Sequence, residues 1–333
     1  MGHRNPLYNI TPDTWEHPAD RAALHALKSV PGLDTVLKTL ISTSTERSLR
    51  LATLASSVRV SEKQFKNVFK IYREACAILD VRDVPELYVS QSPFLNAGAV
   101  GVKNPFIVLN SSTLDALSDD EVMAILGHEL GHCRSGHVLY KTLLAMLLKY
   151  SLSVVQIPLA NIALAAIIAA LREWDRKSEL SADRAGLLTV QNPKVCYELE
   201  MKLAGGRKIE EMDIDEFFKQ AEQYESSGSM ADSVYKLLNL VNQTHPFPVL
   251  RVVELKKWVD SGEYEKIIKG GFKKIGEETV EESFRKAKDT YREDLKTSKD
   301  PLTKTVSNII EGASTTAEVA TDVLKSILNS KKI

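Results

Sequence analysis

Strand-like sequence is confined to one short stretch of this 333-residue chain, and that confinement limits the folds it can adopt. Three segments rich in β-branched or aromatic residues lie between Gly, Asn and Pro residues: 86–90 (ELYVS), 99–102 (AVGV) and 106–109 (FIVL). Helical patterns resume directly afterwards and do not alternate with further strands, which excludes a doubly wound fold. We therefore expect an α+β fold that is predominantly helical and carries a small β-sheet.

Helical patterns occupy both flanks of this stretch. Apolar residues at three- and four-residue spacing predict helices over 20–28 and 33–54, and Ser61 is expected to cap another helix that ends near Leu79. We therefore divide the chain into an N-terminal helical region (1–83), a central region (84–270) and a C-terminal helical tail (271–333).

The tail contains a clear helix start, with Asp300 as the N-cap and Pro301 in the first position. Its apolar residues between 302 and 328 then fall on one helical stripe. We expect this helix to pack on its own domain. The alternatives are contact with a partner, contact with a membrane surface, or occlusion of an active site.

Composition limits the classes of partner and the cellular location that we expect for this chain. The formal net charge is -1, and Lys and Arg are spread along the chain, so there is no electrostatic case for nucleic-acid binding. The three cysteines, Cys76, Cys133 and Cys196, are few, odd in number and far apart, which predicts reduced thiols and a cytoplasmic protein. Residues 1–18 lack the apolar core of a signal peptide, so we expect no export.

A capping box opens the helix that carries the chemistry. Ser118 and Glu121 are three residues apart and predict a helix that runs to about Tyr140. Inside it, His128 and His132 form the ends of an H-E-x-x-H motif. Residues four apart share one helix face, so both imidazoles can reach one metal ion.

Glu129 completes this motif. It lies about 100° around the helix from His128, where it can reach an attacking water without binding the metal. Apolar neighbours on both sides indicate a buried helix, in which ionisable groups need partners. The alternative, two core histidines bonded to backbone carbonyls, leaves Glu129 unexplained.

A catalytic zinc ion normally has three protein ligands, so a third must come from elsewhere. Glu179 is the best candidate, because Asp183 shares its helix face and can orient a histidine ligand from behind. Ala182 is small and would allow close packing against the motif helix. A surface carboxylate on a charged helix is the alternative for Glu179. His137 is predicted to point about 140° away from the ligand face and is interpreted as structural.

The combination of motifs resembles the M48 peptidases, the group of the type I CAAX prenyl protease and HtpX. Gly127-His128-Glu129-Leu130-Gly131-His132 followed by Glu179-x-x-Ala182-Asp183 carries this resemblance. Asn96-Ala97 before a strand, and Thr244-His245-Pro246 with Arg251 six residues after the histidine, extend it. The resemblance covers residues 79–260 and implies a gluzincin-type metallopeptidase with the small sheet beside the H-E-x-x-H helix.

The resemblance implies a role for each motif residue. A zinc ion would be held by His128, His132 and Glu179. Glu129 would be the catalytic base, Asp183 would lie behind the ligands, and His245 and Arg251 would stabilise the oxyanion. For His245 an alternative is the capping of a helix-start turn at Pro246.

The same resemblance suggests how a polypeptide substrate would bind. An extended peptide can add to an exposed edge strand through main-chain hydrogen bonds. Asn96, Ala97 and Gly98 are the candidate residues, and a glycine there would permit close approach. The predicted function is that of a zinc-dependent endopeptidase in protein quality control or processing.

An uncharged stretch over 150–171 raises the question of a membrane. A single span would place the two ligand motifs on opposite sides of the bilayer. A hairpin over 142–171 has arms of roughly 22 Å, short of the ~30 Å hydrocarbon core. We expect a soluble or peripheral enzyme that can touch a membrane through 142–171 or 302–330, which speaks against prenyl-protein processing. The alternative is a latent or non-proteolytic zinc-binding scaffold at a membrane surface.

Overall fold

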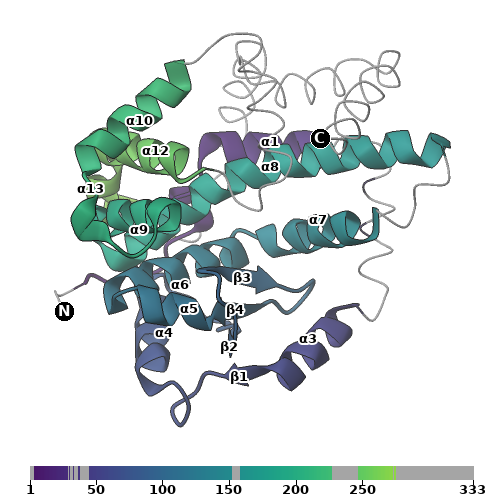
Figure 1. Ribbon diagram of the computed structural model, residues 1–333, viewed down its shortest axis with the longest axis horizontal. Helices are drawn as coiled ribbons and strands as arrows, with labels where there is room; N and C mark the ends of the chain where they lie inside the picture. The colour runs from purple at the N-terminus through teal and green to yellow at the C-terminus, as the bar shows by residue number, and fades with distance from the viewer. Residues whose placement is uncertain are drawn as a thin grey trace.

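The computed structural model describes residues 4–28, 30, 33, 37, 45–151, 158–226, 247–272 and 274. It confirms a predominantly helical α+β fold (Figure 1). The helices before the first ligand motif are α1 (Pro18–Lys28), α3 (Thr45–Ser56), α4 (Lys66–Ile78) and α5 (Ser111–Ala116). Those from the motif onward are α6 (Asp119–Arg134), α7 (His137–Ser151), α8 (Pro158–Val190), α9 (Pro193–Gly205), α10 (Ile214–Ser226), α12 (Pro248–Asp260) and α13 (Glu263–Ile268).

One mixed sheet has the strand order β1-β2-β4-β3. Its members are β1 (Ser57–Arg59), β2 (Glu86–Ser90), β3 (Ala97–Val100) and β4 (Phe106–Asn110). β2 and β4 are parallel, and the two outer strands pair antiparallel to them. The expected strand over 99–102 begins two residues earlier, at Ala97, and forms one edge of the sheet.

Strand β1 corrects the prediction that residues 1–83 are helical throughout. Its three residues pair antiparallel with Tyr88, Val89 and Ser90 of β2. A strand this short has too few residues to show an alternating pattern, so its conformation depends on pairing with a distant segment.

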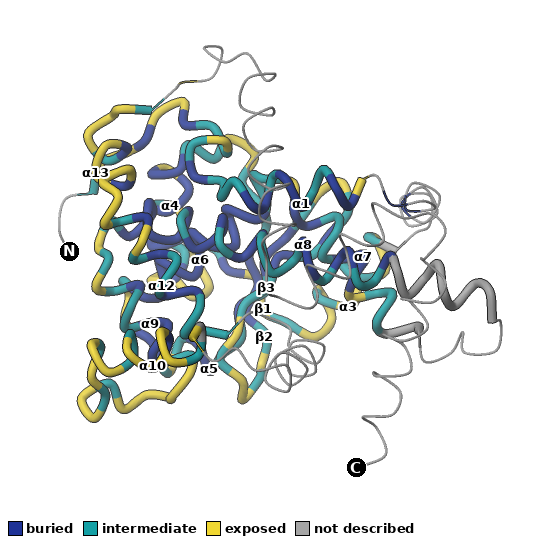
Figure 2. Tube along the Cα trace, turned by 90° about the horizontal axis from the view of Figure 1, so that it is seen from above, coloured by how far each residue is buried: buried dark blue, intermediate teal, exposed yellow. Residues whose placement is uncertain are grey.

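Helices α6 and α8 form the centre of the molecule and are buried along the part where they meet (Figure 2). Small residues let them approach closely. A Cβ atom on Gly131 would lie 2.6 Å from Cβ of Ala185 and 3.4 Å from Cα of Ala182, and one on Gly186 would lie 2.7 Å from the backbone oxygen of Ala124. The expected close packing at Ala182 is therefore present.

Helix α1 lies along α8, on the other side of α8 from the sheet (Figure 1). Its buried face contributes Ala23 and Leu27 to a hydrophobic cluster with Leu144 of α7 and with Leu171 and Trp174 of α8. A second cluster joins the sheet, α4, α6 and the C-terminal part of α8. The N-terminal helix is thus packed directly on the helix that carries the second ligand motif.

The helix predicted from Ser61 begins later. The Ser61 hydroxyl oxygen accepts the N–H groups of Lys63 and Gln64 in a turn, and Phe65 adopts a left-handed φ of 53° just before α4. The hydroxyl thus stabilises a turn, because Ser side chains bond nearby backbone N–H groups in turns as well as at helix caps.

The helix predicted to run from the capping box to Tyr140 is two helices. The box itself is present, with Ser118 accepting the N–H of Glu121. However, α6 ends at Arg134, and Gly136 has a φ of 70°, a conformation that glycine adopts without strain. The chain turns there, so the predicted 140° orientation of His137 is wrong.

The predicted tail helix and the 302–330 contact surface lie outside the described residues. The uncharged stretch over 150–171 contributes the N-terminal part of α8 and the last residues of α7. Within the described ranges, no helix combines the length and the hydropathy needed to cross a bilayer.

Candidate metal centre

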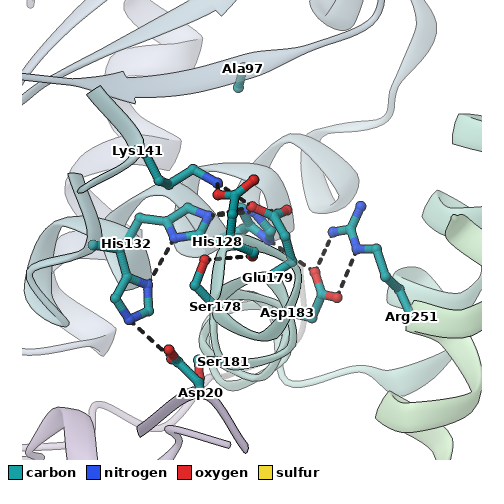
Figure 3. A network of polar contacts seen from close by, with 12 residues as sticks. Asp20, Ala97, His128, His132, Lys141, Ser178, Glu179, Ser181, Asp183 and Arg251 are labelled. Atoms are coloured by element: carbon teal, nitrogen blue, oxygen red, sulfur yellow. Dashed lines mark hydrogen bonds and ion pairs between the residues drawn. The ribbon is translucent and has the colours of Figure 1, made fainter. Parts of the chain in front are cut away.

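Three side chains from the two central helices converge on one point. His128 and His132 come from α6 and Glu179 comes from α8 (Figure 3). The two Nε2 atoms are 3.1 Å apart, Nε2 of His128 lies 3.4 Å from Oε2 of Glu179, and Nε2 of His132 lies 3.2 Å from Oε1. All three residues are buried.

These distances fit a metal ion. Ligands about 2.0–2.1 Å from a tetrahedral zinc ion lie roughly 3.3 Å from one another. The separation between the two Nε2 atoms, 3.1 Å, and the distance from each of them to its nearer Glu179 oxygen, 3.4 and 3.2 Å, are close to that value. Two imidazoles and one carboxylate are also a common catalytic zinc donor set.

The second nitrogen of each histidine has its own partner. Nδ1 of His128 lies 2.9 Å from Oδ1 of Asp183, and Nδ1 of His132 lies 3.0 Å from Nδ1 of His137. A proton on each Nδ1 satisfies these contacts and leaves a lone pair on each Nε2. Two lone pairs that face each other at 3.1 Å require a cation or a proton between them.

Electrostatics favours a positive charge at this point. Burial opposes a charge on His128, but hydrogen bonds to Asp183 and Glu179 outweigh it and raise its pKa to about 10. Burial, and then the charge of Lys141, hold the pKa of His132 well below its usual value. The cluster therefore stabilises one positive charge between His128 and Glu179, and a metal cation can take the place of that proton.

Lys141 of α7 is a member of the site that the sequence did not reveal. Its Nζ atom lies 2.5 Å from Oε1 of Glu179 and 2.7 Å from Oδ1 of Asp175. Burial opposes its charge, but these two carboxylates raise its pKa above the usual value. No motif spacing marks this lysine, because α7 and α8 bring it to Glu179 only in the folded chain.

Arg251 of α12 is directed at Asp183. Its Nε lies 2.9 Å from Oδ2 of Asp183, and its Nη2 contacts Oδ1 of Asp183 and lies 3.2 Å from Oε1 of Glu200. Burial tends to raise the pKa of Asp183, but Arg251 and then His128 lower it. The expected contact of Arg251 with a reacting oxyanion stays a prediction. His245, the other residue expected there, lies outside the described residues.

A cleft of about 510 Å³ opens beside two of the three ligands. His128, Glu129 and Glu179 line one side, and Asn96 and Ala97 line it from the strand β3 side. Figure 3 shows Ala97 across from the ligands. Gly98 has open space where a Cβ would lie, with no atom within 4 Å.

The backbone of β3 offers hydrogen-bonding groups on its free edge. The carbonyl of Asn96 accepts the N–H of Asn110 at 3.0 Å and so faces β4. Backbone groups alternate along a strand, so those of Ala97 face outward. The outward N–H of Ala97 donates to Oδ1 of Asn96, its own neighbour, at 2.9 Å.

Comparison with known proteins places this site in context. Residues 62–259 match the model of "Peptidase family M48". The chain is 34% identical over 267 residues to "Plastoglobule-localized metallopeptidase 48, chloroplastic" from Arabidopsis thaliana, which covers 78% of this chain and 76% of that protein.

Shorter matches involve proteins named HtpX. A "Protease HtpX homolog" from Saccharolobus islandicus is 44% identical over 55 residues, which is 16% of this chain and 17% of that protein. "Protease HtpX" from Shewanella halifaxensis is 38% identical over 63 residues, 18% of this chain and 22% of that protein. No solved structure gives a significant match to the chain.

Proposed function

Because the chain belongs to peptidase family M48 and is a metallopeptidase by descent, we propose that it is a zinc-dependent endopeptidase. The observation that carries the proposal is the convergence of His128, His132 and Glu179: the two Nε2 atoms are 3.1 Å apart, and each lies 3.2–3.4 Å from one oxygen of the Glu179 carboxylate. Zinc is the metal proposed, since it prefers four-coordinate sites with nitrogen and carboxylate ligands.

Glu129 is proposed as the general base. It is 3% exposed, lines the cleft, and follows His128 directly on α6. When bound, zinc lowers the pKa of a water molecule and polarises a carbonyl group. Glu129 would accept a proton from the attacking water and then transfer it to the leaving amine nitrogen.

Asp183 and Arg251 are proposed to act through His128. A carboxylate that accepts the Nδ1 proton of a ligand histidine fixes its ring and raises its basicity. Arg251 holds both oxygens of that carboxylate. The contribution of His245 to oxyanion stabilisation stays a prediction.

The substrate is proposed to be an extended polypeptide segment. The outward backbone of Ala97, beside Asn96 and Gly98, can pair with a main chain of any sequence once its N–H exchanges Oδ1 of Asn96 for a substrate carbonyl. Pairing in this way needs no free chain terminus, which supports an endopeptidase. Extended segments are available in unfolded or flexible proteins, consistent with a role in quality control or processing.

A paired measurement on wild type and Glu129→Gln tests this function. Elemental analysis would report bound metal, and unfolded casein would report cleavage. We expect stoichiometric zinc in both proteins and cleavage by wild type alone, with the variant reduced by about 10²–10⁴-fold or more. Glu222→Gln, an exposed glutamate on α10, is the control and should cleave like wild type.

Other outcomes separate the alternatives. Zinc in both proteins without cleavage by either would favour the latent or scaffold function over the peptidase. An absence of zinc from both would refute the metal centre itself.

A further inference from the structure

A second chain of polar contacts leads from His132 out of the metal centre to helix α1. His137, the first residue of α7, places Nδ1 3.0 Å from Nδ1 of His132. Its Nε2 lies 3.1 Å from Oδ2 of Asp20 in α1, which Figure 3 shows beside Ser181. We propose that Asp20, acting through His137, positions His132 for metal binding and makes helix α1 part of the metal centre.

Hydrogen-bond chemistry fixes the direction of each step. For His132 to bind a metal, Nε2 must carry the lone pair, so Nδ1 carries the proton and donates it. The acceptor is Nδ1 of His137, which leaves the His137 proton on Nε2. That proton is donated to the carboxylate of Asp20. An ionised carboxylate only accepts, so the chain has one consistent arrangement, and it presents Nε2 of His132 to the cluster.

Asp20 is held as a carboxylate. It is 1% exposed, its Oδ1 accepts the indole N–H of Trp174 at 3.0 Å, and its Oδ2 accepts the Ser181 hydroxyl at 2.5 Å. Burial opposes the charge, but His137, Ser181 and Trp174 outweigh it and lower the pKa of Asp20. Three donors in a buried setting fix the position of this carboxylate.

The ring of His137 is equally constrained. It is 1% exposed and packs edge-to-face against Trp174, with centroids 5.5 Å apart. Its centroid also lies 5.3 Å from that of His132. A buried ring that contacts two aromatic neighbours can transmit the position of Asp20 to the ligand.

The plainer interpretation is that Asp20 only anchors α1 to α8 through Trp174 and Ser181. It does not explain why the third donor is a histidine that contacts a metal ligand. The family match begins at residue 62, so Asp20 lies outside the matched stretch, whereas Asp183, which serves His128, lies inside it. The inference rests on the proposed zinc centre.

Metal affinity and the spectrum of a cobalt-loaded protein test the relay in the full chain. Competition with a chelator would give the affinities for Zn²⁺ and Co²⁺, and visible absorption of the Co²⁺ form would report ligand geometry. His137→Phe removes the acceptor for His132, so we expect about 10–100-fold weaker binding and an altered cobalt spectrum.

Conservative variants separate the relay from simple packing. His137→Gln keeps an oxygen that accepts from His132 and an N–H that donates to Asp20, so it should recover most of the affinity. Asp20→Asn keeps a hydrogen-bond acceptor but removes the charge, so its metal affinity should lie between those of wild type and His137→Phe. Ala23→Gly weakens α1 without touching the relay, and its metal affinity should equal that of wild type.

Each contrary result has its own meaning. If wild type binds no metal, the proposed function fails and this inference fails with it. If wild type binds metal and His137→Phe matches its affinity and spectrum, the relay alone is wrong. Equal losses in Ala23→Gly and Asp20→Asn would also refute it, because the packing of α1 would explain both.

Discussion

Arg251 contacts both carboxylate oxygens of Asp183, and the same carboxylate lies 2.9 Å from Nδ1 of His128. The guanidinium therefore stands behind the ligand histidine with a carboxylate between them. A planar two-point ion pair of this kind fixes geometry more firmly than a single contact. Arg251 therefore has two candidate roles. In one it supports metal binding by holding Asp183, and in the other it contacts the reacting oxygen directly.

Arg251→Lys distinguishes these roles. A lysine keeps the charge but cannot hold both oxygens of Asp183, so we expect zinc affinity to fall by about 10-fold or more. A direct effect on the oxyanion would instead lower kcat and leave zinc affinity unchanged. Chelator competition and steady-state kinetics on the same preparations would decide between them.

The variant Arg251→Met carries a separate expectation for stability. It would leave Asp183 and Glu200 buried without their cation, which costs about 3–5 kcal/mol of unfolding free energy. Urea denaturation of metal-free protein would measure this loss. A loss below about 1 kcal/mol would contradict the buried ion pair.

Gly186→Ala tests the contact between the two central helices. Its methyl group would meet the backbone oxygen of Ala124 at 2.7 Å, and a backbone atom in a helix cannot move aside by itself. We expect a loss of about 1–3 kcal/mol in unfolding free energy and weaker metal binding, because α6 and α8 carry the ligands. Gly98→Ala, where the added atom meets open space, is the matched control and should change neither.

Sequence reasoning succeeded where the signal was local. Ser118 and Glu121 predicted the start of α6, and the four-residue spacing of His128 and His132 predicted their shared face. Glu179 lies on a different helix from the two histidines, yet its motif and the small Ala182 near it in the sequence predicted that the two helices pack closely. These features depend on residues within a turn or two of each other.

What the sequence did not reveal depends on contacts between distant segments. Lys141, Glu200 and Asp20 reach the site only after separate helices pack, and nothing in their own neighbourhoods marks them. The predicted orientation of His137 is wrong because the helix breaks at Ser135-Gly136; a glycine at the end of a helical pattern is the signal that marks this break. The cytoplasmic location and the boundaries at 83 and 270 stay predictions.

Lys141→Met tests how the site balances its charge. The ammonium group contacts Glu179, a proposed zinc ligand, so its removal leaves that carboxylate short of a cation in metal-free protein. A bound divalent ion would supply the missing charge. We therefore expect zinc to raise the melting temperature of the variant by more than it raises that of wild type.

Calorimetry with and without chelator would measure both increments. Lys194→Met, an exposed lysine on α9, is the control and should show the wild-type increment. An equal increment in wild type and Lys141→Met would show that Lys141 and the metal do not share Glu179.

Glu254 of α12 holds the start of α1 in place, and its pKa sets a pH dependence. Its Oε2 lies 3.7 Å from Nε2 of His17, and its Oε1 lies 2.8 Å from Nζ of Lys257. Nδ1 of His17 accepts the N–H of Ala19, so the proton of a neutral His17 is on Nε2, facing Glu254. This close contact with His17 is the main cause that lowers the pKa of Glu254 to about 2, and burial opposes it.

The folded state therefore binds this proton less tightly than the unfolded state, whose glutamate has a pKa near 4.5. The stabilisation is fully present above pH 4.5 and is lost as the pH falls towards 2. Glu254→Gln should lower the unfolding free energy by about 1–2 kcal/mol at pH 7, a value reduced for partial solvent exposure, and by almost nothing near pH 2. Urea titrations across this range would measure the difference, and Glu265→Gln, in an exposed pair with Lys269, should show little at any pH. A Glu254→Gln deficit that persists at pH 2 would mean that lost packing, and not the carboxylate charge, is responsible.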